Sequence, residues 1–319
     1  MLTGLKIMVT GGAGFIGSHL VEKLVGMRNT VIVYDNFDRY YLGKEKNIQY
    51  LIDNDFFRLI KADILNYEIL LKSMKGVDVV FHLAAQPGVR FSMVNPIRTS
   101  QVNIIGTLNV LKAARKMGVK RVIFASSSSV YGQPKYLPIN EGHPTEPISI
   151  YGASKLAAEK YCQIFNDQLN LPVVILRYHT VYGPRQRPDM AIYKWTQAIF
   201  EGKPVTIYGD GTQTRDFTFI TDIISGTIKA AEVEGIDGET FNLGGGSRVS
   251  VNNVVKLLIQ ISGVEDVQVN YEPPKLGDVS DTHADINKAR KILGFNPRVP
   301  LKEGLKCFIE WYKKYKLIK

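Results

Sequence analysis

A tyrosine and a lysine stand four residues apart in the segment Tyr151-Gly-Ala-Ser-Lys155. The segment opens a helical pattern, and side chains at this spacing project from one face of a helix. A predicted strand that precedes it ends in four serines, Ser126 to Ser129. A free phenol has a pKa of about 10, so a tyrosine acting as a base near neutral pH needs roughly 4 kcal/mol of preferential stabilisation of its phenolate, which a nearby lysine can contribute. The pattern predicts a tyrosine that takes a proton from a substrate hydroxyl, with a serine as partner or relay.

A glycine-rich turn near the N-terminus has the spacing of a dinucleotide-binding loop. Gly11-Gly-Ala-Gly14-Phe-Ile-Gly17 follows an apolar stretch at Lys6–Thr10 and opens a helical pattern at 16–25. Glycine at the first position allows a tight turn, at the second it lets the backbone approach a pyrophosphate, and at the third it lets helix and strand pack closely. The N-terminus of the helix then faces the phosphates.

Acidic residues at two predicted strand ends indicate which dinucleotide binds. Asp35 ends the second strand, where a carboxylate accepts hydrogen bonds from the ribose hydroxyls of adenosine. The same charge repels a 2′-phosphate, so the sequence predicts NAD rather than NADP. Asp63 ends the third strand, from which it can reach the adenine amine.

These residues need a sheet that brings strand ends together. In the first half, short apolar strands alternate with helical patterns, which is typical of a parallel sheet covered on both faces. We expect a doubly wound α/β fold, a Rossmann domain, over residues 1–184 and a smaller, interleaved α/β lobe over 185–319, with Phe241–Leu243 able to return to the sheet. The predicted strands are Lys6–Thr10, Thr30–Tyr34, Phe57–Ala62, Val77–Ala85, Arg121–Ser126 and Val173–Tyr178, and the main predicted helices are 16–25, Asn103–Met117 and Ser154–Leu169.

The composition excludes several classes of protein. Of 319 residues, 45% are hydrophobic and 22% charged, which excludes disordered and fibrous chains. The net charge of +10 permits nucleic-acid binding, but much of the excess lies in C-terminal lysines spaced like one solvated helix face, so we expect no nucleic-acid partner. Two distant cysteines form no metal or redox motif, and no metal is expected. No apolar run approaches about 18 residues, so we expect a cytoplasmic protein with no membrane partner.

Several motifs together resemble the extended short-chain dehydrogenase/reductase superfamily, specifically its NAD-dependent nucleotide-sugar epimerases. Besides the glycine loop and the Tyr-Lys pair, they are His82-Leu-Ala-Ala85, Ser128-Ser-Val-Tyr-Gly132 and Arg215-Asp-Phe217. The resemblance covers essentially the whole chain and implies tightly held NAD that is regenerated in each turnover. It assigns the base to Tyr151, the catalytic hydroxyl to Ser127, and to Lys155 the lowering of the tyrosine pKa and the binding of the nicotinamide ribose. The implied cofactor-binding residues are Gly11, Gly14, Phe15, Ile16, Gly17, Asp35, Asn36, Asp63, Ile64, Leu83, Ala84, Ala85, Tyr151, Lys155 and Tyr178.

The reaction follows from what is missing beside the catalytic serine. Members of this superfamily oxidise a hexose at C4 to a 4-keto sugar and then diverge. The 4,6-dehydratases carry an acidic residue or an Asp-Glu pair directly after the catalytic hydroxyl, whereas this chain has Ser128 and Ser129. The resemblance therefore implies return of the hydride to the other face of the ketone, which is C4 epimerisation.

Four further segments are similar to UDP-glucuronate 4-epimerases, and they implicate a uronate. They are Gln86-Pro-Gly-Val-Arg90, Thr180-Val-Tyr-Gly-Pro184, Arg187-Pro-Asp-Met-Ala191 and Gly277-Asp278. Small hydroxyls would hold the carboxylate, because a 4-keto uronate is a β-keto acid that can lose CO2. UDP-glucuronate to UDP-galacturonate is thus the favoured conversion, and the substrate-binding residues implied are Arg90, Asn103, Ser127, Ser128, Thr180, Arg187, Arg215 and Asp278.

Other substrates and roles remain open. Arg185-Gln186 is typical of epimerases of neutral UDP-hexoses or UDP-N-acetylhexosamines, so UDP-glucose and its relatives are the close alternative. Decarboxylation of UDP-glucuronate to UDP-xylose is another, and a non-catalytic NAD sensor is a third. Superfamily members pair two long helices into a dimer, here 103–117 and 154–169, so the resemblance implies a homodimer.

Overall fold

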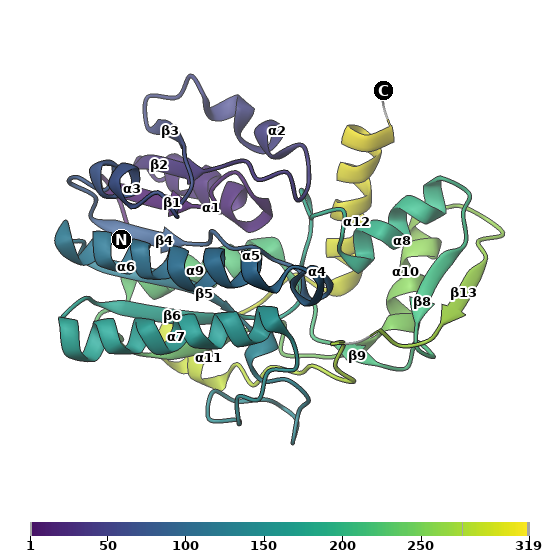
Figure 1. Ribbon diagram of the computed structural model, residues 1–319. Coiled ribbons are helices and arrows are strands. Elements are labelled where there is room, and N and C mark those ends of the chain that lie inside the picture. Colours follow the sequence, from purple (N-terminus) through teal and green to yellow (C-terminus); the bar gives the residue numbers. More distant parts are fainter. Residues whose placement is uncertain (1, 276, 318–319) are drawn as a thin grey trace.

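A sheet of seven parallel strands forms the centre of the computed structural model, which describes residues 2–275 and 277–317 (Figure 1). The strand order is β11-β6-β5-β4-β1-β2-β3. The first strand pairs with both β2 and β4, so the chain winds outward in both directions from it and leaves a crevice at the carboxyl ends of the strands. The strands are β1 (Lys6–Thr10), β2 (Thr30–Asp35), β3 (Phe57–Lys61), β4 (Val79–His82), β5 (Arg121–Ser127), β6 (Val173–Tyr178) and β11 (Thr240–Leu243).

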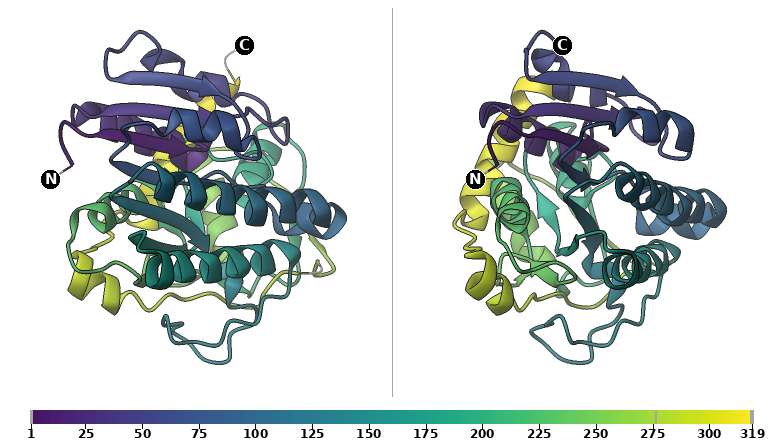
Figure 2. Two further views of the ribbon diagram at one scale, coloured as in Figure 1. Left: turned by 60° about the vertical axis from the view of Figure 1, so that its left-hand side comes forward. Right: turned by 90° about the vertical axis from the view of Figure 1, so that its left-hand side faces the viewer.

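Helices cover both faces of this sheet, which confirms the predicted doubly wound fold (Figure 2). One face packs against α3 (Tyr67–Ser73), α6 (Gly106–Lys116) and α7 (Ile150–Leu169). The other packs against α1 (Phe15–Gly26), α9 (Ile220–Glu232) and α11 (Asn287–Leu293). Every residue of β4 and β6 is buried, which explains why these strands are continuous apolar runs rather than alternating ones.

A smaller lobe lies beside the carboxyl ends of the strands, on the right in Figure 1. Its helices pack around α10, and a parallel pair of strands lines its outer side. Three elements that follow residue 184 in the sequence nevertheless belong to or pack against the main sheet, namely β11, α9 and α11. The division into domains at residue 184 stays a prediction. The lobe contains α8 (Ala191–Phe200), β8 (Val205–Tyr208), α10 (Val251–Ser262), β13 (Val269–Glu272) and α12 (Leu301–Tyr312).

Short elements complete the chain around the crevice. Two small ladders, β7 with β10 and β9 with β12, connect the sheet to the lobe. None of the helices in the described ranges is long and apolar enough to cross a membrane. The remaining elements are α2 (Lys44–Ile48), α4 (Val89–Val94), α5 (Pro96–Ser100), β7 (Val181–Tyr182), β9 (Thr214–Arg215), β10 (Thr218–Phe219), β12 (Val249–Ser250), 3-10 helices at Gln49–Leu51 and Ser128–Val130, and π-helical turns at Gln101–Ile105 and Lys313–Leu317.

Several predicted boundaries differ from the structure, and two of them bear on the site, each for a local reason. The fourth strand ends at His82 rather than Ala85, because the buried histidine ring hydrogen-bonds to Thr10 at 2.7 Å and Thr107 at 2.9 Å while the chain turns away from the sheet. Helix α7 begins four residues before the predicted Ser154, because the Ser149 side chain caps it by accepting the N–H of Gly152. Tyr151 therefore lies within the first turn of a capped helix.

Candidate functional site

The glycine loop between β1 and α1 is closed tightly against its neighbours. Gly11 has a φ of +71°, and a Cβ placed on it would lie 2.7 Å from the backbone nitrogen of Ala84. A Cβ on Gly17 would lie 2.2 Å from the carbonyl oxygen of Gly11. Gly14 at the N-cap has no side chain to cap α1, so the N–H groups of the first turn are available to an anion, apart from that of Phe15, which acts on Tyr41. The loop thus has the shape and electrostatics that a diphosphate requires.

A cavity extends from this loop along the carboxyl ends of the central strands, and we call it the cofactor cavity. All fifteen residues predicted to bind the cofactor line it. The glycine loop forms its middle, Asp35 and Asp63 lie toward the β3 edge of the sheet, and Tyr151, Lys155 and Tyr178 lie toward the β6 edge. The residues present therefore fit a dinucleotide, with adenosine toward β3 and nicotinamide toward β6.

Asp35 is held by backbone N–H groups from the glycine loop and from the segment that follows β2. Its carboxylate accepts the N–H of Ala13 at 3.0 Å and that of Phe37 at 2.8 Å. Burial raises the pKa of Asp35, although the Phe37 hydrogen bond and the charge of Lys44 oppose the rise. A fixed carboxylate at this position can accept from ribose hydroxyls and disfavours a 2′-phosphate, as the choice of NAD requires.

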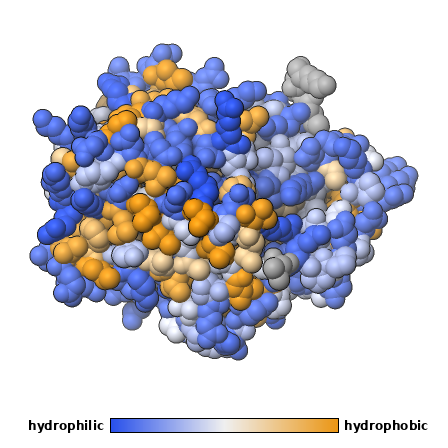
Figure 3. Space-filling view, in the orientation of Figure 1, coloured by the Kyte–Doolittle hydropathy of each residue, from blue (hydrophilic) through white to orange (hydrophobic). Residues whose placement is uncertain are grey.

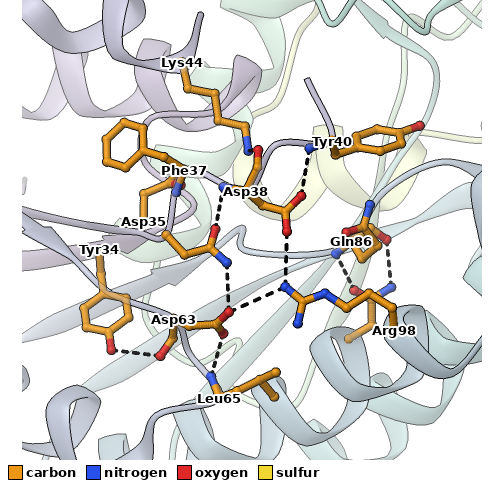
Figure 4. A network of polar contacts seen from close by, with 12 residues as sticks. Tyr34, Asp35, Phe37, Asp38, Tyr40, Lys44, Asp63, Leu65, Gln86 and Arg98 are labelled. Carbon is orange, nitrogen blue, oxygen red and sulfur yellow. Dashed lines mark hydrogen bonds and ion pairs between the residues drawn. The ribbon is translucent and has the colours of Figure 1, made fainter. Parts of the chain in front are cut away.

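A network of charges closes the adenosine end of the cavity (Figure 4). Asn36 donates to Asp63 at 2.9 Å. Arg98 reaches from α5 to lie 3.2 Å from Asp38 and 3.6 Å from Asp63, and Lys44 donates to the carbonyl of Asp38 at 2.7 Å. Sequence reasoning missed Asp38, Lys44 and Arg98, because no motif marks them and the two partners of the Arg98–Asp38 pair are 60 residues apart.

Tyr151 and Arg187 both line the cofactor cavity, toward the β6 edge for Tyr151. The Arg187 charge and the Ser127 hydroxyl both act to lower the pKa of the Tyr151 phenol. The Ser127 hydroxyl also accepts the N–H of Ser129 at 3.1 Å. Lys155 donates to the carbonyl oxygen of Ala125 at 2.7 Å. One phenol and two cations, those of Tyr151, Lys155 and Arg187, therefore line the same cavity, whereas Ser127 lies beside it at the end of β5.

Burial dominates the titration of this group of residues. It raises the pKa of Tyr151, and the Arg187 charge and Ser127 hydrogen bond oppose the rise without outweighing it. Burial also lowers the pKa of Lys155 to about 8. The predicted role of Lys155 in lowering the tyrosine pKa stays a prediction, because Arg187 is the cation that exerts this effect on the protein side.

A buried ion pair supports the serine-bearing end of β5. The Arg177 guanidinium donates to both carboxylate oxygens of Glu159, at 3.0 and 2.7 Å. Ser126 donates to the same carboxylate, and Arg177 also donates to the Tyr131 hydroxyl at 2.9 Å. These contacts join α7, β5 and β6 behind the Tyr151 site. Glu159 lies one helical turn after Lys155, a spacing that could have indicated its inward orientation.

Two further cavities continue from the cofactor cavity toward the lobe. The middle cavity lies between α4 and α8 and shares Tyr40 and Arg187 with the cofactor cavity. The outer cavity lies beside β13 and shares Tyr208 and Asp278 with the middle one. A ligand in the middle and outer cavities can thus reach the Tyr151 end of the cofactor cavity, and Tyr40 stands at the junction although sequence reasoning missed it.

Several predicted substrate residues line these outer spaces. Arg90 forms an ion pair with Asp278 at 3.0 Å, and its guanidinium lies 4.5 Å from the centre of the Tyr208 ring. Arg215 lines the outer cavity and donates to three carbonyl groups, those of Thr214, Val279 and Ser280. Arg90, Arg215 and Asp278 therefore meet around one groove, with Arg187 at its inner end.

The structure does not bring the other predicted residues into these cavities. The Asn103 amide is used by the protein, since it accepts the N–H of Gln86 at 2.7 Å and donates to Ser154 at 2.9 Å. Ser128 begins a 3-10 helix and Thr180 lies beside β10, and neither lines the three cavities. Their contact with a substrate stays a prediction. Within the described ranges, no three side chains of His, Cys, Asp or Glu gather as a metal site.

Arg185 and Gln186, which suggested a neutral sugar, point elsewhere. Arg185 pairs with Glu22 at 2.8 Å and donates to the Tyr50 hydroxyl at 3.2 Å. The Gln186 amide is buried and lies 3.5 Å from the Val181 carbonyl oxygen. Neither side chain lines the three cavities, so this pair stabilises a loop rather than contacting a sugar there.

Comparison with known proteins places the chain among sugar-nucleotide enzymes. Residues 7–244 match the NAD dependent epimerase/dehydratase family. An uncharacterized UDP-glucose epimerase of Bacillus subtilis (strain 168) is 42% identical over 94% of this chain and 96% of its own length. A UDP-glucuronate 4-epimerase of Thermodesulfobacterium geofontis is 38% identical over 96% of this chain and 95% of its own.

A solved structure is also close in shape. The UDP-glucuronic acid 4-epimerase of Bacillus cereus, in complex with UDP-glucuronic acid and NAD, superposes with a TM-score of 0.92 at 41% identity. The alignment covers 97% of this chain and 99% of that one. The similarity therefore extends over both the sheet and the lobe.

Proposed function

The chain belongs to the NAD-dependent epimerase/dehydratase family, and from this premise we propose that it is a UDP-sugar 4-epimerase that interconverts UDP-glucuronate and UDP-galacturonate. The observation that carries the proposal is the junction of cavities. Arg187 lies where the groove for a sugar nucleotide meets the nicotinamide end of the cofactor cavity, and its charge acts on Tyr151. A sugar bound there has its reacting carbon beside the base and its C6 carboxylate within reach of a cation.

The residues around Tyr151 support proton transfer at C4. Oxidised NAD, when bound, supplies a hydride acceptor and a positive ring that favours the tyrosine phenolate. The Tyr151 oxygen takes the proton from the 4-hydroxyl as that carbon is oxidised and returns it when the ketone is reduced. Ser127 orients the phenol, and Lys155 holds the nicotinamide ribose through its ammonium group. Rotation of the 4-keto sugar before reduction inverts C4.

The serines after Ser127 favour epimerisation over dehydration. Elimination of water needs an acid and a base at the sugar, and neither Ser128 nor Ser129 carries a carboxyl group. A uronate adds a second requirement, because its 4-keto form is a β-keto acid. It loses CO2 when the bond from C5 to the carboxylate lies out of the plane of the C4 ketone. A guanidinium that fixes the carboxylate suppresses this loss. We therefore place Arg187 at the carboxylate, while the contact of Ser128 and Thr180 with it stays a prediction.

A neutral UDP-hexose is the second candidate, because the Bacillus subtilis relative carries the name of a UDP-glucose epimerase. The sequence feature that favoured it is the Arg185-Gln186 pair. Since both side chains are directed into the protein rather than into the groove, we favour the uronate.

Replacement of the base tests the enzymatic part of this proposal. Tyr151→Phe should lower turnover of UDP-glucuronate by a factor of about 100 or more, because a positioned base contributes about 10² to 10⁴ in rate. The NAD content of the purified protein should stay at the wild-type level, as measured by chromatography after acid release. Tyr136→Phe removes a hydroxyl from an exposed tyrosine outside the three cavities and should leave turnover within two-fold. A Tyr151→Phe enzyme with near wild-type rate would refute the assignment.

We further propose that the protein is a homodimer. Apolar residues gather over α5, α6 and α7 on the face shown in Figure 3. Ile97 is 70% exposed, Ile105 49% and Ile164 50%. Burial of this surface in a second copy would remove it from water. Ile164→Asp should shift the mass measured by light scattering toward the monomer, and an unchanged mass would argue against this face.

The cytoplasmic location expected from the sequence stays a prediction.

A further inference from the structure

The Arg187 guanidinium is held by a second residue of the same loop. It donates to both carboxylate oxygens of Asp189, through Nε at 2.9 Å and through Nη2 at 3.0 Å. The two side chains are 20% and 29% exposed, so the pair is largely shielded from water. Two parallel hydrogen bonds between a guanidinium and a carboxylate fix the plane of the arginine as well as its position.

This geometry leaves one side of the arginine for a ligand. Among the contacts of the described residues, the Nη1 group of Arg187 donates to no protein acceptor. Because Nε and one N–H of Nη2 are committed to Asp189, the remaining donors lie on the opposite side of the guanidinium. Arg187 lines both the cofactor cavity and the middle cavity, so a ligand at their junction can meet these donors.

A tyrosine connects the same carboxylate to the loop at residues 36–43, which follows β2 and lines the cofactor cavity. Tyr40 donates its hydroxyl to Asp189 at 2.9 Å and lines both cavities. Its ring packs edge-on against Phe91, with centroids 4.9 Å apart, and its N–H donates to Asp38. Burial raises the pKa of Asp189, but the Arg187 charge and the hydrogen bonds from Arg187 and Tyr40 outweigh burial and keep this carboxyl ionised. The loop after β2 is thus connected to the arginine through one carboxylate.

We propose that Asp189 is a positioning residue for substrate specificity: with Tyr40, it holds Arg187 so that the free side of the guanidinium receives the C6 carboxylate of a UDP-hexuronate. This inference rests on the proposed function and deepens it. Asp189 contacts neither the sugar nor the cofactor in this account. It acts through Arg187. Because Tyr40 donates to Asp189, the position of the Arg187 guanidinium also depends on the loop that follows β2.

Binding measurements without turnover test the proposal. Affinities of UDP-glucuronate and UDP-glucose are measured by calorimetry on the NAD-loaded Tyr151→Phe protein, and their ratio defines the uronate preference. Adding Asp189→Asn should lower this preference about ten-fold, equivalent to about 1.4 kcal/mol, because Asn can accept only one of the two guanidinium hydrogen bonds. Adding Tyr40→Phe should lower it about three-fold, the effect of one neutral donor. Because Tyr40 acts through Asp189, the double substitution should match Asp189→Asn alone.

A second carboxylate that pairs with an arginine of the same loop supplies the matched control. Glu22→Gln removes the partner of Arg185, which lies 2.8 Å away and outside the three cavities, and the preference should stay within two-fold. If the NAD-loaded Tyr151→Phe protein without further substitutions prefers UDP-glucose, the proposed function is wrong and this inference is wrong with it. If it prefers UDP-glucuronate and both Asp189→Asn and Tyr40→Phe keep that preference within two-fold, the proposed function stands and Asp189 has no positioning role. Tyr40→Phe keeps its ring packing, so it decides the matter should Asp189→Asn fail to fold.

Discussion

Loss of the buried carboxylate of Glu159 should cost the protein about 3 kcal/mol of its free energy of unfolding. Its side chain is 1% exposed and that of Arg177 is 7% exposed. Removing one partner of a buried ion pair typically costs about 3 to 5 kcal/mol, because the other charge stays buried without compensation. Arg177 keeps its hydrogen bonds to Tyr131 and to the Glu141 carbonyl, so we expect Glu159→Gln at the lower end of that range.

The assay is thermal unfolding of the NAD-loaded protein. At about 2.1 cal/mol/K per residue, a chain of this length loses about 4 to 5 °C in Tm for 3 kcal/mol. The same substitution at Glu303, which pairs with Lys306 at 3.0 Å on the surface, is the control and should change the free energy of unfolding by less than about 0.5 kcal/mol. If Glu159→Gln and Glu303→Gln shift Tm equally, burial does not make the Glu159–Arg177 pair more stabilising than a surface pair.

Three further changes have outcomes that follow from the structure. Gly17→Ala places a methyl group 2.2 Å from the Gly11 oxygen, so the NAD content of the purified protein should fall below half, whereas full retention would contradict the tight loop. Burial raises the pKa of Asp216 from 3.8 to about 6, so its contribution to stability is present below pH 3.8 and is lost as the pH rises through 6. Urea unfolding should therefore show the free energy of unfolding of wild type falling by about 2 kcal/mol relative to that of Asp216→Asn between pH 4 and pH 7, and a constant difference would refute the shift. Asp35→Asn should improve binding of NADPH relative to NADH by about ten-fold in a fluorescence titration, since it removes a charge that repels the 2′-phosphate, and an unchanged ratio would show that another group selects NAD.

Local patterns were sufficient to predict residues that line one common cavity, whereas their contact with NAD stays a prediction. The glycine spacing, the strand-end Asp35 and Asp63 and the Tyr151–Lys155 pair each follow from a short motif, and every predicted cofactor residue lines one cavity. Such motifs are recoverable because the backbone conformation that they require is encoded within a few residues.

Contacts between distant segments were not recoverable in the same way. The Tyr40–Asp189 hydrogen bond joins residues 149 positions apart, and the topology alone brings them together. Asn103, which the resemblance implies at the substrate, has its amide hydrogen-bonded to the Gln86 backbone and to Ser154, and no motif predicts these contacts. A motif indicates which residue type stands at a position, whereas its hydrogen-bond partners depend on which segments the fold places beside it.

We propose that this chain epimerises a uronate with NAD that it already holds. Proton NMR of the purified protein with UDP-glucuronate, UDP-glucose or UDP-N-acetylglucosamine in separate tubes, without added cofactor, tests it directly. We predict UDP-galacturonate from the first tube and no product from the other two. Turnover of only a neutral sugar, or formation of UDP-xylose in place of UDP-galacturonate, would contradict the account.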